Sequence, residues 1–151
     1  MSSAESGTQS VVVERNIPHP PEKIWRALTQ PHLITEWLMK GDDFRPLVGQ
    51  RFNLSRQATP EIHISIDCEV LEVEANRTLS YTWTYADKDP AYHLESVVTF
   101  TLTPTAGGTL LRMEQSGFRP DQTQALFGAR YGWDEFLGNL GKLLDADPAA
   151  A

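Results

Sequence analysis

The side chains best suited to chemistry in this 151-residue chain are hydroxyl and amide groups that alternate with large apolar residues. Tyr81, Tyr85, Ser96 and Gln115 can each form hydrogen bonds, and each shares its strand phase with apolar neighbours. A few polar groups among aromatic side chains are typical of a small-molecule pocket. The predicted ligand contacts are Trp37, Phe52, Tyr81, Trp83, Tyr85, Ser96, Phe100, Met113, Gln115, Phe127, Tyr131 and Trp133. An ordinary filled core is the alternative, and the pattern leaves both open.

The mouth of such a pocket is expected to be aromatic, formed by Trp37, Phe44, Phe127, Tyr131 and Trp133. The inward set depends on strand phase. The alternation slips at Val70 and Leu71, which predicts a β-bulge. A register slip of one residue there would turn a hydroxyl-rich set inward in place of the tyrosines and tryptophan, namely Ser80, Thr82 and Thr84.

Other chemistry has little support in the sequence. The four histidines, His19, His32, His63 and His93, share no metal-ligand spacing, so no metal site is predicted. His63 and His93 fall in the solvent-facing strand phase. Cys68 has apolar neighbours two residues away on each side, which raises a thiol's pKa and makes it inert. Asp67 and Glu69 share the outward phase. No nucleophile motif or glycine-rich phosphate loop occurs. No catalytic residue or cofactor is therefore predicted; Tyr81, Tyr85 or Ser96 would be the most suitable general acid or base.

Charge and composition exclude several classes of partner. Acidic residues outnumber basic ones by 20 to 13, giving a net charge of −7. Phosphate backbones and anionic membrane surfaces repel such a chain, so neither nucleic acid nor membrane is expected as a partner. One cysteine excludes an internal disulfide, and no targeting or membrane-spanning segment is evident. A cytoplasmic single-domain protein is the expectation.

Hydrophobic periodicity predicts the order β–α–α–β–β–β–β–β–α. The expected elements are a strand at 11–17, helices at 20–29 and 31–39, strands near 51–55, 62–70, 79–85, 94–102 and 109–117, and a helix over the last 25 residues. Four glycines in that helix predict close approach to another element or a break near Gly128: Gly128, Gly132, Gly138 and Gly141. The predicted boundaries are a disordered leader at 1–10, one domain at 11–145 and a frayed tail at 146–151.

Four stretches in this order resemble the SRPBCC or START-related helix-grip superfamily. They are Val13–Leu38 (VERNIPHPPEKIWRALTQPHLITEWL), Gly49–Phe52 (GQRF), Leu79–Trp83 (LSYTW) and Tyr131–Leu140 (YGWDEFLGNL). Within the superfamily the chain is similar to the C-terminal domain of the activator of the 90-kDa heat-shock protein's ATPase. The resemblance implies an α+β fold, with a curved antiparallel sheet of about six strands wrapped on a long C-terminal helix and two short helices after the first strand.

Members of this superfamily bind lipids, polyketides and other apolar small molecules, and some are cyclases. The function expected here is binding of an apolar or aromatic small molecule between sheet and helix. A cyclase- or dehydratase-like enzyme and a co-chaperone-like interaction domain are the alternatives. The activator carries a further N-terminal domain that this chain has no room for, so contact with the chaperone is not expected. Trp25 lies off the apolar stripe of its helix, which leaves a homodimer open.

Overall fold

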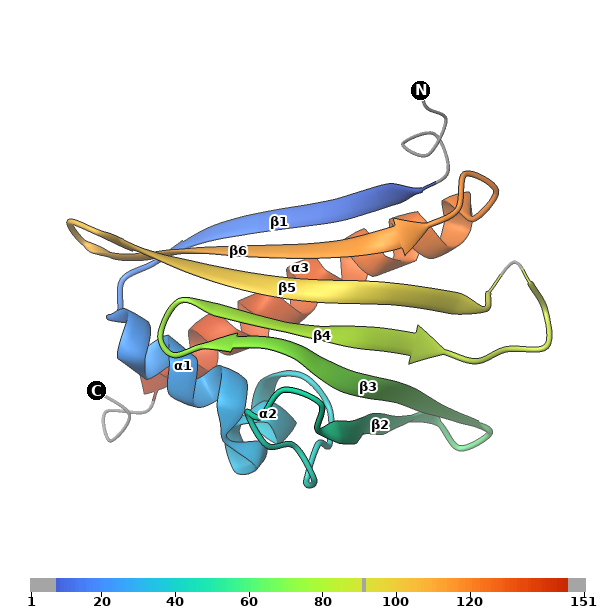
Figure 1. Ribbon diagram of the computed structural model, residues 1–151, viewed down its shortest axis with the longest axis horizontal. Coiled ribbons are helices and arrows are strands. Elements are labelled where there is room, and N and C mark those ends of the chain that lie inside the picture. The colour runs from blue at the N-terminus through green and yellow to red at the C-terminus, as the bar shows by residue number, and fades with distance from the viewer. Residues whose placement is uncertain (1–7, 91, 147–151) are drawn as a thin grey trace.

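A computed structural model describes residues 8–90 and 92–146 (Figure 1). Its elements are β1 (Gln9–Ile17), α1 (Pro21–Thr29), α2 (Pro31–Trp37), β2 (Arg51–Thr59), β3 (Ile62–Glu74), β4 (Thr78–Tyr85), β5 (Leu94–Thr105), β6 (Gly108–Phe118) and α3 (Thr123–Ala146). The strands form one antiparallel sheet in the order β1-β6-β5-β4-β3-β2. Helix α3 crosses one face of this sheet, and α1 and α2 pack against α3. The predicted α+β architecture of six strands and three helices is confirmed.

The two short helices begin where proline permits. Pro21 and Pro31 lie in the first turns of α1 and α2, where a backbone N–H would have no helical partner. Gln30 ends α1 and begins α2 in an extended conformation, as expected for a residue before proline. Helix α2 ends at Trp37, two residues before the predicted end.

The predicted bulge lies in β3. Val70 pairs with Tyr81 and Glu72 pairs with Ser80, so Leu71 is the extra residue and its side chain is exposed. With this register Tyr81 and Trp83 face the core and are 4% and 6% exposed. The one-residue slip that would have turned them outward does not occur.

The turn between β5 and β6 requires glycine at position 108. Gly108 has φ of +155°, and a Cβ there would lie 2.1 Å from the carbonyl oxygen of Ile17. The predicted hairpin over 104–108 is confirmed, and it closes against the end of β1.

Helix α3 is continuous over 24 residues, so the predicted break near Gly128 is wrong. Close approach does not explain the glycines either. A Cβ built at Gly128, Gly138 or Gly141 meets no atom of the described residues within 4 Å. The helix buries a different set of side chains against the sheet, namely Trp133, Leu137, Leu140 and Leu144.

The predicted domain boundaries shift slightly at the start of the chain. Strand β1 begins at Gln9, so Gln9 and Ser10 belong to the sheet and not to the leader. Helix α3 ends at Ala146, the first residue of the predicted tail. The rest of the predicted leader and tail, residues 1–7 and 147–151, lies outside the described residues.

Candidate functional site

The interior between sheet and α3 contains a chain of hydrogen bonds among four predicted ligand contacts. The indole Nε1 of Trp133 donates to Oε1 of Gln115 at 2.7 Å, and Nε2 of Gln115 donates to Oγ of Ser96 at 2.9 Å. Ser96 Oγ in turn donates to the carbonyl oxygen of Trp83 at 2.8 Å. All four residues are buried. Two of the four polar side chains expected to orient a ligand, Gln115 and Ser96, are therefore bonded to each other.

The predicted aromatic contacts form a connected cluster in the same interior. Ring centroids of Phe52 and Tyr81 are 5.0 Å apart, those of Phe100 and Trp133 are 5.8 Å apart, and those of Trp83 and Trp133 are 5.2 Å apart. The first two contacts are edge-to-face and the third is tilted, and aromatic contacts at these distances stabilise a core. Most of the predicted contacts are buried in this core, namely Trp37, Phe52, Tyr81, Trp83, Phe100, Met113 and Trp133, with Tyr85 half-buried beside them.

The predicted mouth is corrected by these positions. Trp37, Phe44 and Trp133 are each 2% or 3% exposed and belong to the core. Trp37 also donates from Nε1 to the carbonyl oxygen of Ala27 at 2.8 Å, which ties α2 to α1. Only Phe127 and Tyr131 of the five predicted mouth residues are exposed, at 61% and 75%.

Tyr81 and Cys68 are the interior groups with perturbed acidity. Burial raises the pKa of the Tyr81 hydroxyl, and the neighbouring Cys68 adds to the effect. Burial also raises the pKa of the Cys68 thiol, followed by the charges of Asp67 and Asp43. Both groups are neutral at physiological pH, so neither is an activated nucleophile or base.

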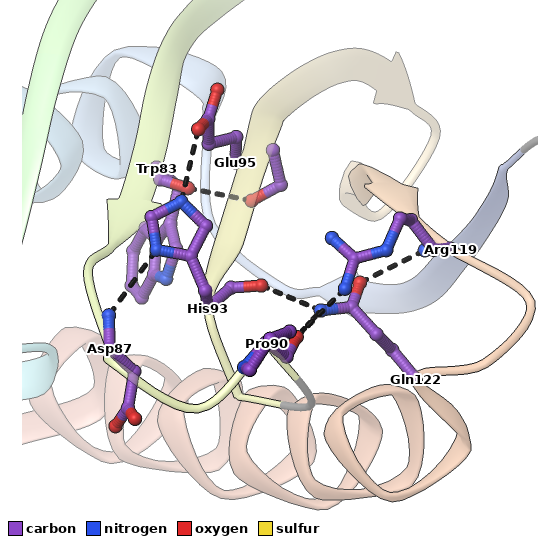
Figure 2. A network of polar contacts seen from close by, with 8 residues as sticks. Trp83, Asp87, Pro90, His93, Glu95, Arg119 and Gln122 are labelled. Carbon is purple, nitrogen blue, oxygen red and sulfur yellow. Dashed lines mark hydrogen bonds and ion pairs between the residues drawn. The ribbon is translucent and has the colours of Figure 1, made fainter.

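Figure 2 shows how the link between β4 and β5 is fastened to the start of α3. Gln122, which is 2% exposed, donates from Nε2 to the carbonyl oxygens of His93 at 2.6 Å and Pro90 at 3.3 Å. Arg119 donates from its guanidinium to the same Pro90 oxygen at 2.7 Å, and its backbone N–H donates to Oε1 of Gln122 at 3.0 Å. These contacts fix where α3 begins.

His93 is partly exposed, with 33% of its side chain accessible, and it also holds surface contacts. Its Nδ1 accepts the backbone N–H of Asp87 at 3.3 Å, and its Nε2 lies 3.0 Å from Oε2 of Glu95 (Figure 2).

Neither Gln122 nor Arg119 was identified by sequence reasoning. Pro120 and Asp121 indicate a turn between β6 and α3, but no motif marks the residues beside them as anchors.

The opposite end of α3 is held by α1 and the segment before it. Lys23, which is 4% exposed, donates from Nζ to the carbonyl oxygen of Leu144 at 2.6 Å. His19 Nε2 lies 2.7 Å from Oδ1 of Asp145, and its Nδ1 lies 3.2 Å from Lys23 Nζ. A cation at a helix C-terminus stabilises the last carbonyls.

A groove runs between the end strand β1 and α3. Its first part has a volume of about 550 Å³, and its second part about 270 Å³. The first part is lined by Val12, Val13, Glu14, Arg15, Phe127, Arg130, Tyr131 and Asp134. The second part lies over Gly138 and Gly141. An ion pair between Arg15 and Asp134 joins the two sides of the groove where the parts meet.

Three predicted ligand contacts line hollows of the described surface. We call the whole groove the β1–α3 groove. Phe127 and Tyr131 line its first part. Ser96 borders a smaller hollow of about 370 Å³, whose lining includes several hydroxyl-bearing residues. Among the described residues, no group of three or more histidine, cysteine or acidic side chains is arranged to hold a metal ion. No helix in residues 8–90 and 92–146 is long and apolar enough to span a membrane.

The curved antiparallel sheet with a long C-terminal helix across one face defines a helix-grip, START-like protein. The chain belongs to the family described as Activator of Hsp90 ATPase homolog 1-like protein, whose model matches residues 18–145. No curated protein matches the chain.

Solved structures of similar proteins have the same fold. Protein MLL2253 from Mesorhizobium loti is 64% identical, with 91% of this chain and 98% of that chain covered and a TM-score of 0.85. CV1439 from Chromobacterium violaceum is 22% identical, with 91% and 99% covered and a TM-score of 0.80. CalU16 from Micromonospora echinospora is 25% identical, with 91% and 76% covered and a TM-score of 0.70. The resemblance to the helix-grip superfamily is confirmed.

Proposed function

We propose that this chain is a small binding protein for an apolar or aromatic small molecule, held in the β1–α3 groove. Binding proteins are common in its fold family, which supports the class. The observation that carries the site is the exposed aromatic pair Phe127 and Tyr131 in a groove of about 550 Å³. Pockets for small molecules usually have volumes of roughly 300–1,000 Å³.

The groove is a better site than the interior around Gln115 and Ser96, because these two side chains already have hydrogen-bond partners. A ligand that bonded to Gln115 or Ser96 would have to break the hydrogen bonds to Trp133 and the carbonyl of Trp83. It would also have to displace packed aromatic side chains. Phe127 and Tyr131 leave water on binding without any such cost, so burying them favours the complex.

The spacing on α3 explains why these two side chains lie together. Residues four positions apart are neighbours on one helix face, and Phe127 and Tyr131 have this spacing. Trp133 and Leu137 lie on the buried face and hold the helix against the sheet. The proposed ligand-binding face of α3 is thus opposite the face that packs against the sheet.

The test is binding of a neutral fluorescent aromatic, N-phenyl-1-naphthylamine, to the wild type and to a Phe127→Ala/Tyr131→Ala variant. We expect affinity to fall about tenfold, equivalent to about 1.4 kcal/mol, because two aromatic contacts are lost. Leu47→Ala is the control, since Leu47 is an equally exposed apolar side chain outside the groove. Equal affinity in wild type and the double variant would refute the site.

Native mass spectrometry of protein purified from its own host identifies a natural ligand. An extra mass that is lost on denaturation, and that the double variant does not retain, supports the proposal. We further propose a cytoplasmic location and no stimulation of the heat-shock protein's ATPase.

A further inference from the structure

We infer that the β1–α3 groove selects a ligand that carries an acidic group beside its apolar body, and that Arg130 binds this group. The inference rests on the proposed function, since it concerns the same groove. It adds the chemical class of the ligand, an amphipathic organic anion such as an aromatic carboxylate or sulfonate.

The charges lining the groove carry the argument. Arg15 is paired with Asp134 across the groove, and Glu14 lies 3.8 Å from Arg112 on β6. Arg130 lines the same groove, is exposed, and has no ion pair or hydrogen bond with any other described residue. Arg130 is therefore the one cation of the groove lining without an ion pair among the described residues. The four charged side chains of the lining sum to zero, whereas the chain as a whole carries a net charge of −7.

The position of Arg130 suits a ligand with two parts. Arg130 lies three residues after Phe127, which places these two side chains on one side of α3, and both line the groove together with Tyr131. A planar guanidinium can bind a carboxylate, sulfonate or phosphate with two parallel hydrogen bonds. The apolar body of such a ligand would then lie on Phe127 and Tyr131.

The Arg15–Asp134 ion pair sets the length of ligand that the aromatic part accepts. It separates the part lined by Phe127 and Tyr131 from the part over Gly138 and Gly141. A ligand confined to the first part leaves this ion pair intact. Its acidic group then meets Arg130 as the one unpaired cation there.

The experiment compares two probes with similar aromatic bodies, 8-anilinonaphthalene-1-sulfonate and the neutral N-phenyl-1-naphthylamine. We expect Arg130→Gln to weaken binding of the sulfonate about fivefold and to leave the neutral probe unchanged. The loss should shrink at high salt, because exposed charges are screened. Arg45→Gln is the matched control, since Arg45 is an exposed cation outside the groove.

The outcomes separate this inference from the proposed function. Suppose that both probes need Phe127 and Tyr131 but that Arg130→Gln changes neither affinity. The inference that Arg130 binds an acidic group is then refuted, whereas the groove remains supported as the binding site. If the Phe127→Ala/Tyr131→Ala variant binds the neutral probe as the wild type does, the proposed function fails. If a second copy of the chain covers the groove, a doubled mass and weaker probe binding at higher protein concentration will overturn the inference.

Discussion

Replacing Gln115 by leucine tests whether the interior polar chain is structural. The substitution has nearly the same volume, but it removes the acceptor of Trp133 Nε1 and the donor to Ser96. Ser96 keeps its own bond to the carbonyl of Trp83, so the principal defect is an indole N–H left unpaired in a core where Trp133 is 2% exposed. Leaving such a donor unsatisfied costs about 1–3 kcal/mol.

We therefore expect Gln115→Leu to lower the free energy of unfolding by about 2 kcal/mol, measured by urea denaturation. For a domain of this size that corresponds to a Tm lower by roughly 4–8 °C. Gln9→Leu is the control, because Gln9 is an exposed glutamine on β1 and its loss should change stability by less than about 0.5 kcal/mol.

A double-mutant cycle with Trp133→Phe isolates the hydrogen bond. Phenylalanine lacks the N–H, so its presence removes the unsatisfied donor that Gln115→Leu creates. The double variant should be less destabilised than the sum of the single variants by about 1 kcal/mol. Strict additivity would refute the reasoning. Gln115→Leu should also leave affinity for the neutral probe unchanged, whereas a ligand anchored in the interior would lose affinity.

Two further predictions concern α3 and the buried acids. Gly128→Ala and Gly138→Ala should each raise the free energy of unfolding, by up to about 1 kcal/mol, since a Cβ at either position meets no described atom within 4 Å; an unchanged or lower value in urea denaturation would contradict this. Burial raises the pKa values of the Cys68 thiol and the Tyr81 hydroxyl above their ordinary 9.0 and 10.0, so folding favours the neutral forms. Their stabilising contribution is fully present below about pH 9 and is lost as the pH rises further. Cys68→Ala should reduce the slope of the free energy of unfolding against pH above pH 9. An unchanged slope would show that ionisation of the Cys68 thiol does not contribute to the loss of stability.

Much of the fold follows from local pattern, because strand alternation is a short-range signal. The alternation from Ile62 to Val70 and the slip at Leu71 predicted both the inward face of β3 and its bulge. Gly107 and Gly108 indicated the hairpin in the same way. The hydrogen-bonded chain was not predictable, since Gln115 and Trp133 lie on different elements and meet only through tertiary packing.

The error at the predicted mouth has a simple geometric cause. A helix turns by about 100° per residue, so Trp133 points about 200° away from Tyr131. The two side chains therefore cannot line one opening, although both are aromatic and close in sequence. Applying the helical angle to the predicted mouth separates the exposed pair Phe127 and Tyr131 from the buried Trp133.

The anchoring of α3 at both ends affects where this helix opens locally. Isolated helices fray from their termini, but Gln122 secures the link before α3 and Lys23 binds the carbonyl of Leu144 near its end. Between these anchors, the side facing β1 is bridged by the exposed Arg15–Asp134 ion pair. We therefore expect amide hydrogen exchange near both ends of α3 to be slower than in a helix with free ends.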